Sequence, residues 1–201
     1  MRTLVLFSGG LDSAVLLASM APDVVALTFD EGHNRRAIDY AEKFCDVREI
    51  EHKVVPLSLG ESGPRDGRIF AMLSVASSYA VSLGAKQIAF GATADDRDVF
   101  RGSTWSFTQH VNASGILLPV IAPFVYREKW TVLKEGLMQH RVDPRDTWSC
   151  VAPGDEPSPC TQCDPCKRRR AADILLLRER DGKAMRYNPD TGTMVELFPR
   201  R

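Results

Sequence analysis

The chain has 201 residues, of which 26 are Lys or Arg and 26 are Asp or Glu, so its formal net charge at pH 7 is zero. A domain commonly runs to about 100–200 residues, so this length predicts one main domain with room for a small appendage. The balanced charge provides no basic field that would hold nucleic acid by counterion release, so neither tRNA nor DNA is the expected partner. No apolar run approaches the roughly 18 residues of a membrane span and no signal-peptide pattern precedes the first strand, so we expect a soluble, cytoplasmic protein with no membrane partner.

Apolar segments in the first third of the chain predict a repeating strand-helix unit. In chain order we expect a strand at residues 4–7, a helix at 14–20, a strand at 23–29, a helix at 35–44 and a strand at 53–57. The second strand lacks polar alternation, which is typical of a parallel sheet covered on both faces. Because a helix lies between each pair of successive strands, we expect the strands to pair in parallel through right-handed crossovers.

The rest of the chain continues this pattern and then changes in character. After a Gly- and Pro-rich loop at residues 60–67, we expect a helix at 68–83, strands at 86–90 and 117–123, helices at 129–139 and 167–180, and a hairpin around 188–192. The expected fold class is α/β, with a single doubly wound parallel sheet. Ligands of such sheets collect beyond the carboxyl ends of the strands, so the loops after Phe7, Phe29 and Phe90 are expected around one crevice.

The loop between the first strand and the first helix reads Ser8-Gly9-Gly10-Leu11-Asp12-Ser13. Two glycines let the backbone approach an anion closely, and the N–H groups that begin the following helix point at it. The spacing matches neither the Walker phosphate loop nor the dinucleotide fingerprint. The sequence therefore predicts a phosphate site of another type, the alternative being an ordinary tight turn.

Four of the five cysteines, Cys150, Cys160, Cys163 and Cys166, fall within seventeen positions, whereas Cys45 lies alone. In a reducing compartment such clustering favours a metal over disulfides. Tetrahedral zinc takes four thiolates at about 2.3 Å, so we predict structural Zn²⁺ with no open coordination position. An iron–sulfur cluster, a disulfide pair and unligated thiols are the alternatives. The lobe would hold Trp148 and the arginines at 168–170 against the crevice, although that arginine run is equally consistent with a solvated helix face.

The glycine loop resembles that of the ATP-pyrophosphatase (PP-loop) enzymes. Together with Leu27-Thr28-Phe29-Asp30-x-Gly32, Thr147-Trp148-Ser149-Cys150 and the cysteine cluster, it resembles the 7-cyano-7-deazaguanine synthases, the QueC family, over most of residues 3–172. The resemblance implies an adenine nucleotide alpha hydrolase-like fold with a small C-terminal four-cysteine zinc lobe. It also implies an ATP-dependent carbon–nitrogen ligase of queuosine biosynthesis, which converts 7-carboxy-7-deazaguanine and ammonia to 7-cyano-7-deazaguanine (preQ0) through an acyl-adenylate.

The resemblance also implies roles for single residues. The ATP site would comprise Phe7, Ser8, Gly9, Gly10, Leu11, Asp12, Ser13, Leu27, Thr28 and Phe29, with Asp12 and Ser13 as the catalytic residues. Asp12 would share Mg²⁺ with the pyrophosphate or cap the helix. The deazaguanine or the acyl-adenylate would contact Asp30, Thr93, Asp95, Asp96 and Arg101, with Phe100, Trp105 and Phe107 available for stacking.

Two stretches depart from the family pattern. Gly63-Pro64-Arg65-Asp66-Gly67 stands where family members carry Val-Pro-Gly-Arg-Asn, and residues 95–101 (DDRDVFR) stand in place of Asp-x-Ser-Gly-Tyr-Pro-Asp-Cys-Arg. The alternatives are therefore a divergent QueC-like ligase that stops at the amide or activates a different carboxylate, a PP-loop tRNA-thiolation enzyme, and a zinc-stapled nucleotide-binding module without catalysis. The neutral charge and the closed cysteine site argue against thiolation.

These motifs also divide the chain. We predict a PP-loop nucleotide-binding domain at residues 1–145, a zinc-binding lobe with its helix at 146–180, and a hairpin-like extension at 181–201. The extension lies beyond the region that resembles the family, and it would serve a homodimer contact or another partner.

Overall fold

The computed structural model describes residues 1–33, 35–57, 65–96, 102, 107, 118–152, 158–179, 185–188 and 193–196. For residues 65, 66, 95, 175–179 and the last two of these ranges it gives the backbone alone. None of the helices in this described part is long and apolar enough to cross a bilayer.

Within the described ranges, one sheet of five parallel strands has the order β3-β2-β1-β4-β5. Its strands are β1 (Thr3–Leu6), β2 (Val24–Asp30), β3 (Glu51–Pro56), β4 (Gln87–Phe90) and β5 (Val120–Ile121). The first strand of the chain is central, and its Val5 lies opposite Ala26 of β2 and Ala89 of β4. The predicted single parallel α/β sheet is confirmed. The fifth strand is shorter than predicted because Pro119 and Pro123 bound it and proline cannot donate to a strand ladder.

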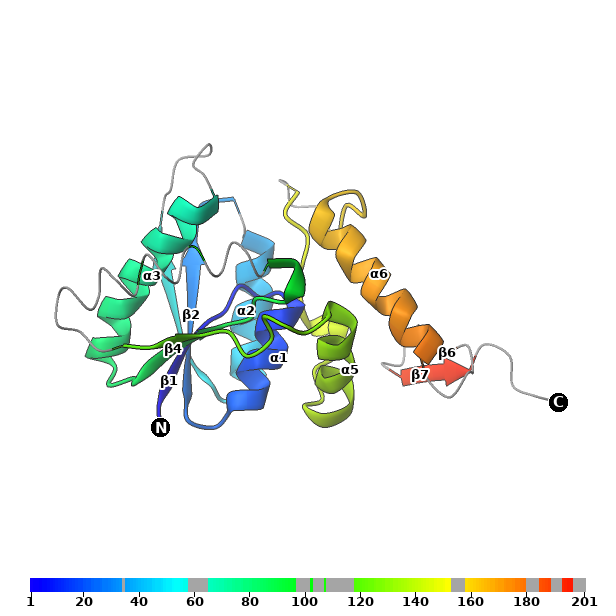
Figure 1. The fold of residues 1–201 in the computed structure, drawn as a ribbon, viewed down its shortest axis with the longest axis horizontal. Coiled ribbons are helices and arrows are strands. Elements are labelled where there is room, and N and C mark those ends of the chain that lie inside the picture. The colour runs from blue at the N-terminus through cyan, green and yellow to red at the C-terminus, as the bar shows by residue number, and fades with distance from the viewer. Residues whose placement is uncertain are drawn as a thin grey trace.

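Helices cover both faces of this sheet (Figure 1). They are α1 (Leu11–Met20), α2 (Arg35–Val47), α3 (Arg65–Ser82), α5 (Lys129–Gln139) and α6 (Asp164–Glu179), with short 3₁₀ turns η1 (Ala94–Asp96) and η2 (Pro144–Asp146). Figure 1 shows α3 on one side of the sheet and α1 with α2 on the other, while α5 packs on α1 and α6 packs on α5. The hairpin expected near the C-terminus is present as β6 (Met185–Asn188) antiparallel to β7 (Thr193–Glu196).

The two faces of the sheet define two apolar cores. Under α1, α2 and α5, the side chains of Leu16, Leu17 and Phe44 are at most 3% exposed. Under α3, Leu73, Ile88 and Phe107 are fully buried. Each such side chain stabilises the fold by about 1.5–3 kcal/mol relative to an exposed position. These cores hold the carboxyl ends of β1, β2 and β4 in fixed register at one edge of the sheet.

Candidate functional site

The glycine loop joins β1 to α1 at the carboxyl edge of the sheet. Gly9 has φ +74°, and a Cβ added there would lie 2.1 Å from the carbonyl oxygen of Ala37 on α2. Both the left-handed backbone and the close approach of α2 therefore require glycine at this position. Gly10 is the N-cap of α1 and provides no side-chain hydrogen bond to the first helical turn. The N–H groups of that turn thus have no side-chain cap, as a phosphate site at a helix N-terminus requires.

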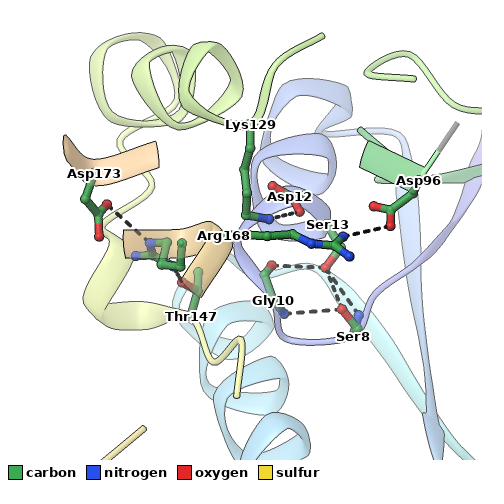
Figure 2. Close-up of polar contacts among 10 residues, drawn as sticks. Ser8, Gly10, Asp12, Ser13, Asp96, Lys129, Thr147, Arg168 and Asp173 are labelled. Carbon is green, nitrogen blue, oxygen red and sulfur yellow. Dashed lines mark hydrogen bonds and ion pairs between the residues drawn. The ribbon is translucent and has the colours of Figure 1, made fainter. Parts of the chain in front are cut away.

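The two serines of the loop hydrogen-bond within it (Figure 2). The Ser13 hydroxyl donates to the Gly10 carbonyl oxygen at 3.0 Å and accepts from the Ser8 backbone N–H at 3.3 Å. The two hydroxyl oxygens lie 3.1 Å apart. These contacts hold the loop in its curved shape. The Ser13 side chain is 6% exposed, so its hydroxyl is committed mainly to loop shape in this structure.

Asp12 forms an ion pair with Lys129, the first residue of α5 (Figure 2). The two side chains are 18% and 14% exposed. Asp12 Oδ1 is buried and has no hydrogen-bond partner among the described residues. Burial raises the pKa of the Asp12 carboxyl, and the Lys129 ammonium opposes that rise. One carboxylate oxygen of the loop is thus held by a cation, and the other is a buried acceptor.

Two further glycines hold the elements around this ion pair closely together. A Cβ on Gly91, directly after β4, would lie 2.8 Å from the backbone carbon of Asp12 and the nitrogen of Ser13. A Cβ on Gly136 of α5 would lie 2.4 Å from a methyl group of Val15. Glycine at both positions lets β4 and α5 approach α1, and this packing places Lys129 against Asp12.

A cavity of about 640 Å³ opens above the loop, at the carboxyl ends of β1, β2 and β4. The residues predicted for ATP or the acceptor that line it are Phe7, Ser8, Gly10, Leu11, Asp12, Ser13, Leu27, Phe29 and Asp96. The predicted crevice is therefore a real cavity, and it contains most of the predicted nucleotide residues. Its ligand and the role of each residue remain predictions.

Other predicted site residues lie elsewhere. Gly9, Thr28, Asp30 and Thr93 are not among the lining residues. Asp30 accepts a hydrogen bond from the Gly32 N–H at 2.9 Å, and Thr93 is 1% exposed. The side chain of Asp95 and the whole of Arg101 lie outside the described residues, as do Phe100 and Trp105. Phe107 is fully buried under α3, where the centroid of its ring lies 6.5 Å from that of Phe70.

Thr28 is directed into the protein and not into the cavity. Its hydroxyl donates to the Phe7 carbonyl oxygen at 2.6 Å and lies 2.7 Å from His52 Nε2. Because the Thr28 proton goes to Phe7, His52 Nε2 donates to Thr28 Oγ1. Burial lowers the pKa of His52, which keeps this ring neutral. The pair fixes Phe7, the residue between β1 and the glycine loop.

Charged residues that the sequence reasoning did not single out also line the cavity. Besides Lys129, these are Glu31 and Arg68, which form an ion pair between the loop after β2 and α3, and Arg36 of α2. Arg168 of α6, one of the arginines predicted against the crevice, also lines the cavity and pairs with Asp96 at 3.2 Å (Figure 2). No local motif marks Lys129 or Arg68, because a lysine or arginine in the first turns of a helix is a common surface residue. Their role becomes visible only in the folded chain.

The four clustered cysteines converge on one point. Cys150, Cys160, Cys163 and Cys166 offer sulfur atoms that all lie within 4.8 Å of one another. Four sulfurs at 2.3 Å from a tetrahedral ion are about 3.8 Å apart, and the sulfurs of Cys163 and Cys150 are 3.9 Å apart. The donor set and its spacing therefore fit a metal ion held by four thiolates. Cys45 is buried in α2 and takes no part in this group.

Backbone N–H groups support the thiolate form of this group. The Cys163 N–H donates to the sulfur of Cys160 at 3.4 Å, and the Cys160 N–H donates to that of Cys150 at 3.4 Å. The backbone hydrogen bond from Cys163 is the main cause that lowers the pKa of Cys160 to about 6. Burial raises the pKa of Cys166 to about 12, so a metal bound there would have to displace its proton.

The parallel sheet with a glycine loop after its central first strand, and the cysteine group beside the cavity, together define a PP-loop α/β protein. Sequence comparison gives the family within that class. The family described as "Queuosine biosynthesis protein QueC" matches residues 2–66 and 64–174. The chain belongs to the QueC family, which confirms the resemblance found in its motifs.

Curated relatives agree with this assignment. The chain is 29% identical over 203 residues to a 7-cyano-7-deazaguanine synthase of Caldicellulosiruptor bescii, covering 84% of this chain and 90% of that protein. It is 28% identical over 205 residues to the enzyme of that name from Pseudoalteromonas atlantica, covering 85% and 93%. It is also 28% identical over 207 residues to that from Archaeoglobus fulgidus, covering 86% and 85%.

A more distant similarity exists to a solved structure, the U34-tRNA thiolase NcsA from Methanococcus maripaludis with its 4Fe–4S cluster. The TM-score is 0.49 at 19% identity, covering 90% of this chain and 67% of that one. A likeness at this level bears on neither the acceptor nor the metal of the present chain.

Proposed function

We propose that this chain is an ATP-dependent carbon–nitrogen ligase that makes 7-cyano-7-deazaguanine from 7-carboxy-7-deazaguanine and ammonia. Membership of the QueC family and the names of its relatives support the product. One structural observation carries the chemistry: the glycine loop, the Asp12–Lys129 pair and the Arg168–Asp96 pair line the same cavity. That arrangement brings a phosphate site, cations and hydrogen-bonding carboxylates within reach of one bound substrate pair.

In the first step, an oxygen of the acceptor carboxylate attacks the α-phosphorus of ATP. Pyrophosphate leaves, and the carboxylate becomes an acyl-adenylate, which is a far better electrophile. Negative charge gathers on the phosphate oxygens during this transfer, so the protein contributes chiefly by orienting the reactants and neutralising charge. The groups proposed for that role are the N-terminal turn of α1, which has no side-chain cap, and the ammonium of Lys129.

The carboxylate of Asp12 fits a divalent cation. Oδ1 is a buried oxygen acceptor without a partner among the described residues, and magnesium prefers carboxylate and phosphate oxygens. When bound, Mg²⁺ would neutralise charge on the departing pyrophosphate. Asp12 is therefore proposed as its protein ligand, while Lys129 holds the second oxygen of the same carboxylate. The alternative that Asp12 caps α1 is not favoured, because its carboxylate pairs with Lys129 and Gly10 is the N-cap of the helix.

In the second half of the reaction, ammonia attacks the carbonyl carbon of the acyl-adenylate and AMP leaves with formation of the amide. The amide oxygen then attacks the α-phosphorus of a second ATP, pyrophosphate leaves, and the amide nitrogen gives up one of its two protons. Loss of AMP together with the remaining N–H proton yields the nitrile. Each nitrile therefore consumes two ATP, whereas an enzyme that stops at the amide consumes one.

Zinc is the metal proposed for the four-cysteine group. Four thiolates with sulfur spacing near 3.8 Å suit tetrahedral Zn²⁺ and leave no open position for substrate. Zinc at this site would supply folding energy for residues 146–180 and take no part in the reaction. The proposed boundaries at 145/146 and 180/181, a cytoplasmic location and a homodimer remain predictions.

The acceptor is the part of the proposal with a competing candidate. Asp96, one of the acids expected to bind the purine-like edge of the acceptor, already forms an ion pair with Arg168 at 3.2 Å. The ion pair occupies a carboxylate that the acceptor would need, and residues 95–101 depart from the family pattern. The second candidate is therefore a QueC-like ligase that stops at the amide or activates another carboxylate.

One experiment separates these candidates. The purified protein is given ATP, Mg²⁺, ammonia and 7-carboxy-7-deazaguanine, and AMP and the product mass are measured together. Two AMP per nitrile support the synthase, and one AMP per amide supports the second candidate. Absence of acid-dependent AMP formation refutes the proposed acceptor. Lys129→Met should lower AMP formation by about 100-fold or more, and Lys134→Met, on the exposed face of the same helix, is its matched control.

A further inference from the structure

A short segment connects the four-cysteine group directly to the glycine loop. The backbone N–H of Trp148 donates to the carbonyl oxygen of Gly9 at 2.8 Å. Two residues later, Cys150 contributes its sulfur to the four-cysteine group, and both residues line the cavity. A single stretch of three residues therefore spans from the proposed metal to the proposed phosphate site.

The contact with Gly9 fixes the orientation of one particular peptide plane. The carbonyl of Gly9 and the N–H of Gly10 belong to the same planar peptide and point in opposite directions. A peptide between two glycines rotates more easily than any other, because neither residue has a Cβ. Here its carbonyl is held by Trp148 at 2.8 Å, and its N–H donates to Ser8 Oγ at 3.4 Å. Rotation of this plane would change the shape of the loop where it enters α1.

The Trp148 segment is itself held from two other elements. The Trp148 ring packs on the ring of Tyr40 from α2, with centroids 5.5 Å apart and planes inclined by 34°. The Thr147 hydroxyl accepts from Arg169 Nη1 of α6 at 3.2 Å (Figure 2). It donates to the Pro144 carbonyl oxygen at 2.8 Å. Arg169 follows Cys166 by three residues on α6, so the second support also begins at the cysteine group.

We infer that Trp148 is a positioning residue that couples the four-cysteine group to the nucleotide site. With metal bound, residues 147–150 are held in place, the Gly9–Gly10 peptide keeps one orientation, and the loop is preformed for phosphate. Without metal, the segment loses its anchor at Cys150, and nucleotide must order it on binding. The inference rests on the proposed function in taking the glycine loop as the ATP site and the four-cysteine group as a metal site.

Coupling of this kind is reciprocal. If metal tightens nucleotide binding by some factor, nucleotide tightens metal binding by the same factor. An offset aromatic contact contributes about 0.5–1.5 kcal/mol, which corresponds to roughly 2–10-fold in a dissociation constant. Loss of the Tyr40–Trp148 contact should therefore weaken nucleotide binding by about 5-fold. Tyr40 itself does not line the cavity, so its replacement removes no atom that a bound nucleotide would touch there.

The test measures binding of α,β-methylene-ATP by calorimetry, because this analogue cannot transfer its adenylyl group. On metal-loaded protein, Tyr40→Leu and Trp148→Ala should raise the dissociation constant about 5-fold, and Trp148→Phe should restore it to within about 2-fold. The matched control is Tyr126→Leu, because Tyr126 is 67% exposed and does not line the cavity. Unchanged affinity in Tyr40→Leu would overturn the inference.

A second arm removes the metal by chelation and follows far-UV circular dichroism alongside binding. Wild-type protein should lose about tenfold in affinity, whereas Trp148→Ala should lose clearly less, since its coupling is already broken. Equal losses in the two proteins would refute coupling through Trp148. If the chelated proteins unfold, the Tyr40→Leu result on loaded protein decides alone. Wild-type loaded protein that fails to bind the analogue refutes the proposed function, whereas binding that is equal in all variants refutes only the coupling.

Discussion

Replacement of Lys129 by methionine is the most direct test of the ion pair at the centre of the site. The change removes the cation beside Asp12 while keeping a long apolar side chain in its place. Breaking a buried ion pair from one side costs about 3–5 kcal/mol. Because the two side chains are 14% and 18% exposed, water can reach them, and a cost below this range, about 2–3 kcal/mol, is expected.

The loss of stability should depend on pH with a defined sign. Burial raises the pKa of Asp12, and Lys129 opposes this rise, so Lys129→Met lets the pKa increase further. A carboxyl whose pKa is higher in the folded than in the unfolded chain favours folding at low pH and loses that contribution as pH rises through the folded-state pKa. The destabilisation by Lys129→Met should therefore be larger at pH 8 than at pH 5.

Urea unfolding at both pH values gives the free energies, with Lys134→Met as control. The double variant Asp12→Ala/Lys129→Met leaves no charge unpaired and should recover most of the lost stability. Both variants should still lose about 100-fold or more in AMP formation, since removal of one preorganised charge-stabilising group costs about that much. A Lys129→Met protein that is stable and active, or a double variant less stable than the single one, would show that the pair does not have the role assigned to it.

Further predictions concern the loop, the metal group and the buried histidine. Gly9→Ala should lower the free energy of unfolding by about 3 kcal/mol or more in thermal unfolding, because φ is +74° and the added Cβ meets a carbonyl oxygen at 2.1 Å. The control Gly32→Ala, with φ +81° but open space around the added Cβ, should lower it by only about 1–2 kcal/mol. Equal losses in the two variants would count against the clash. Cys163→Ser should lower metal content by elemental analysis together with the melting temperature, whereas Cys45→Ala should leave metal content unchanged. Burial lowers the pKa of His52 below its ordinary 6.5, so the contribution of the neutral ring to stability is present above that pH and lost as pH falls through the folded-state pKa. His52→Gln should therefore flatten the decline of unfolding free energy at acid pH, measured by urea titration. An unchanged decline would contradict the buried, neutral state of this ring.

Much of the fold could be predicted because its signals are local. The helix at residues 129–139 has the same bounds in the structure as in the prediction. α1 begins earlier than predicted, at Leu11, because Gly10 of the glycine loop is itself the N-cap. α6 also begins earlier, at Asp164, since Asp164 and Pro165 suit the first turn of a helix even within a cysteine cluster.

The site was less predictable where it depends on which face a side chain occupies. The family resemblance implies an ATP contact for Leu27, Thr28 and Phe29 alike, yet Leu27 and Phe29 line the cavity and Thr28 does not. Side chains alternate along a strand, so this difference could have been foreseen from the strand itself. Lys129 could not, because its meeting with Asp12 spans 117 positions and depends on how α5 packs against α1.

The central place of β1 has a consequence for how the chain acquires its fold during synthesis. β1 pairs with β2 within the first 27 residues, but its other edge is covered only when Gln87–Phe90 has been made. Until then the nascent chain exposes the N–H and C=O groups of an apolar strand, which is a template for pairing with another chain. While the residues between β3 and β4 are being synthesised, this open edge of β1 is therefore expected to bind a chaperone or to pair slowly with another nascent chain.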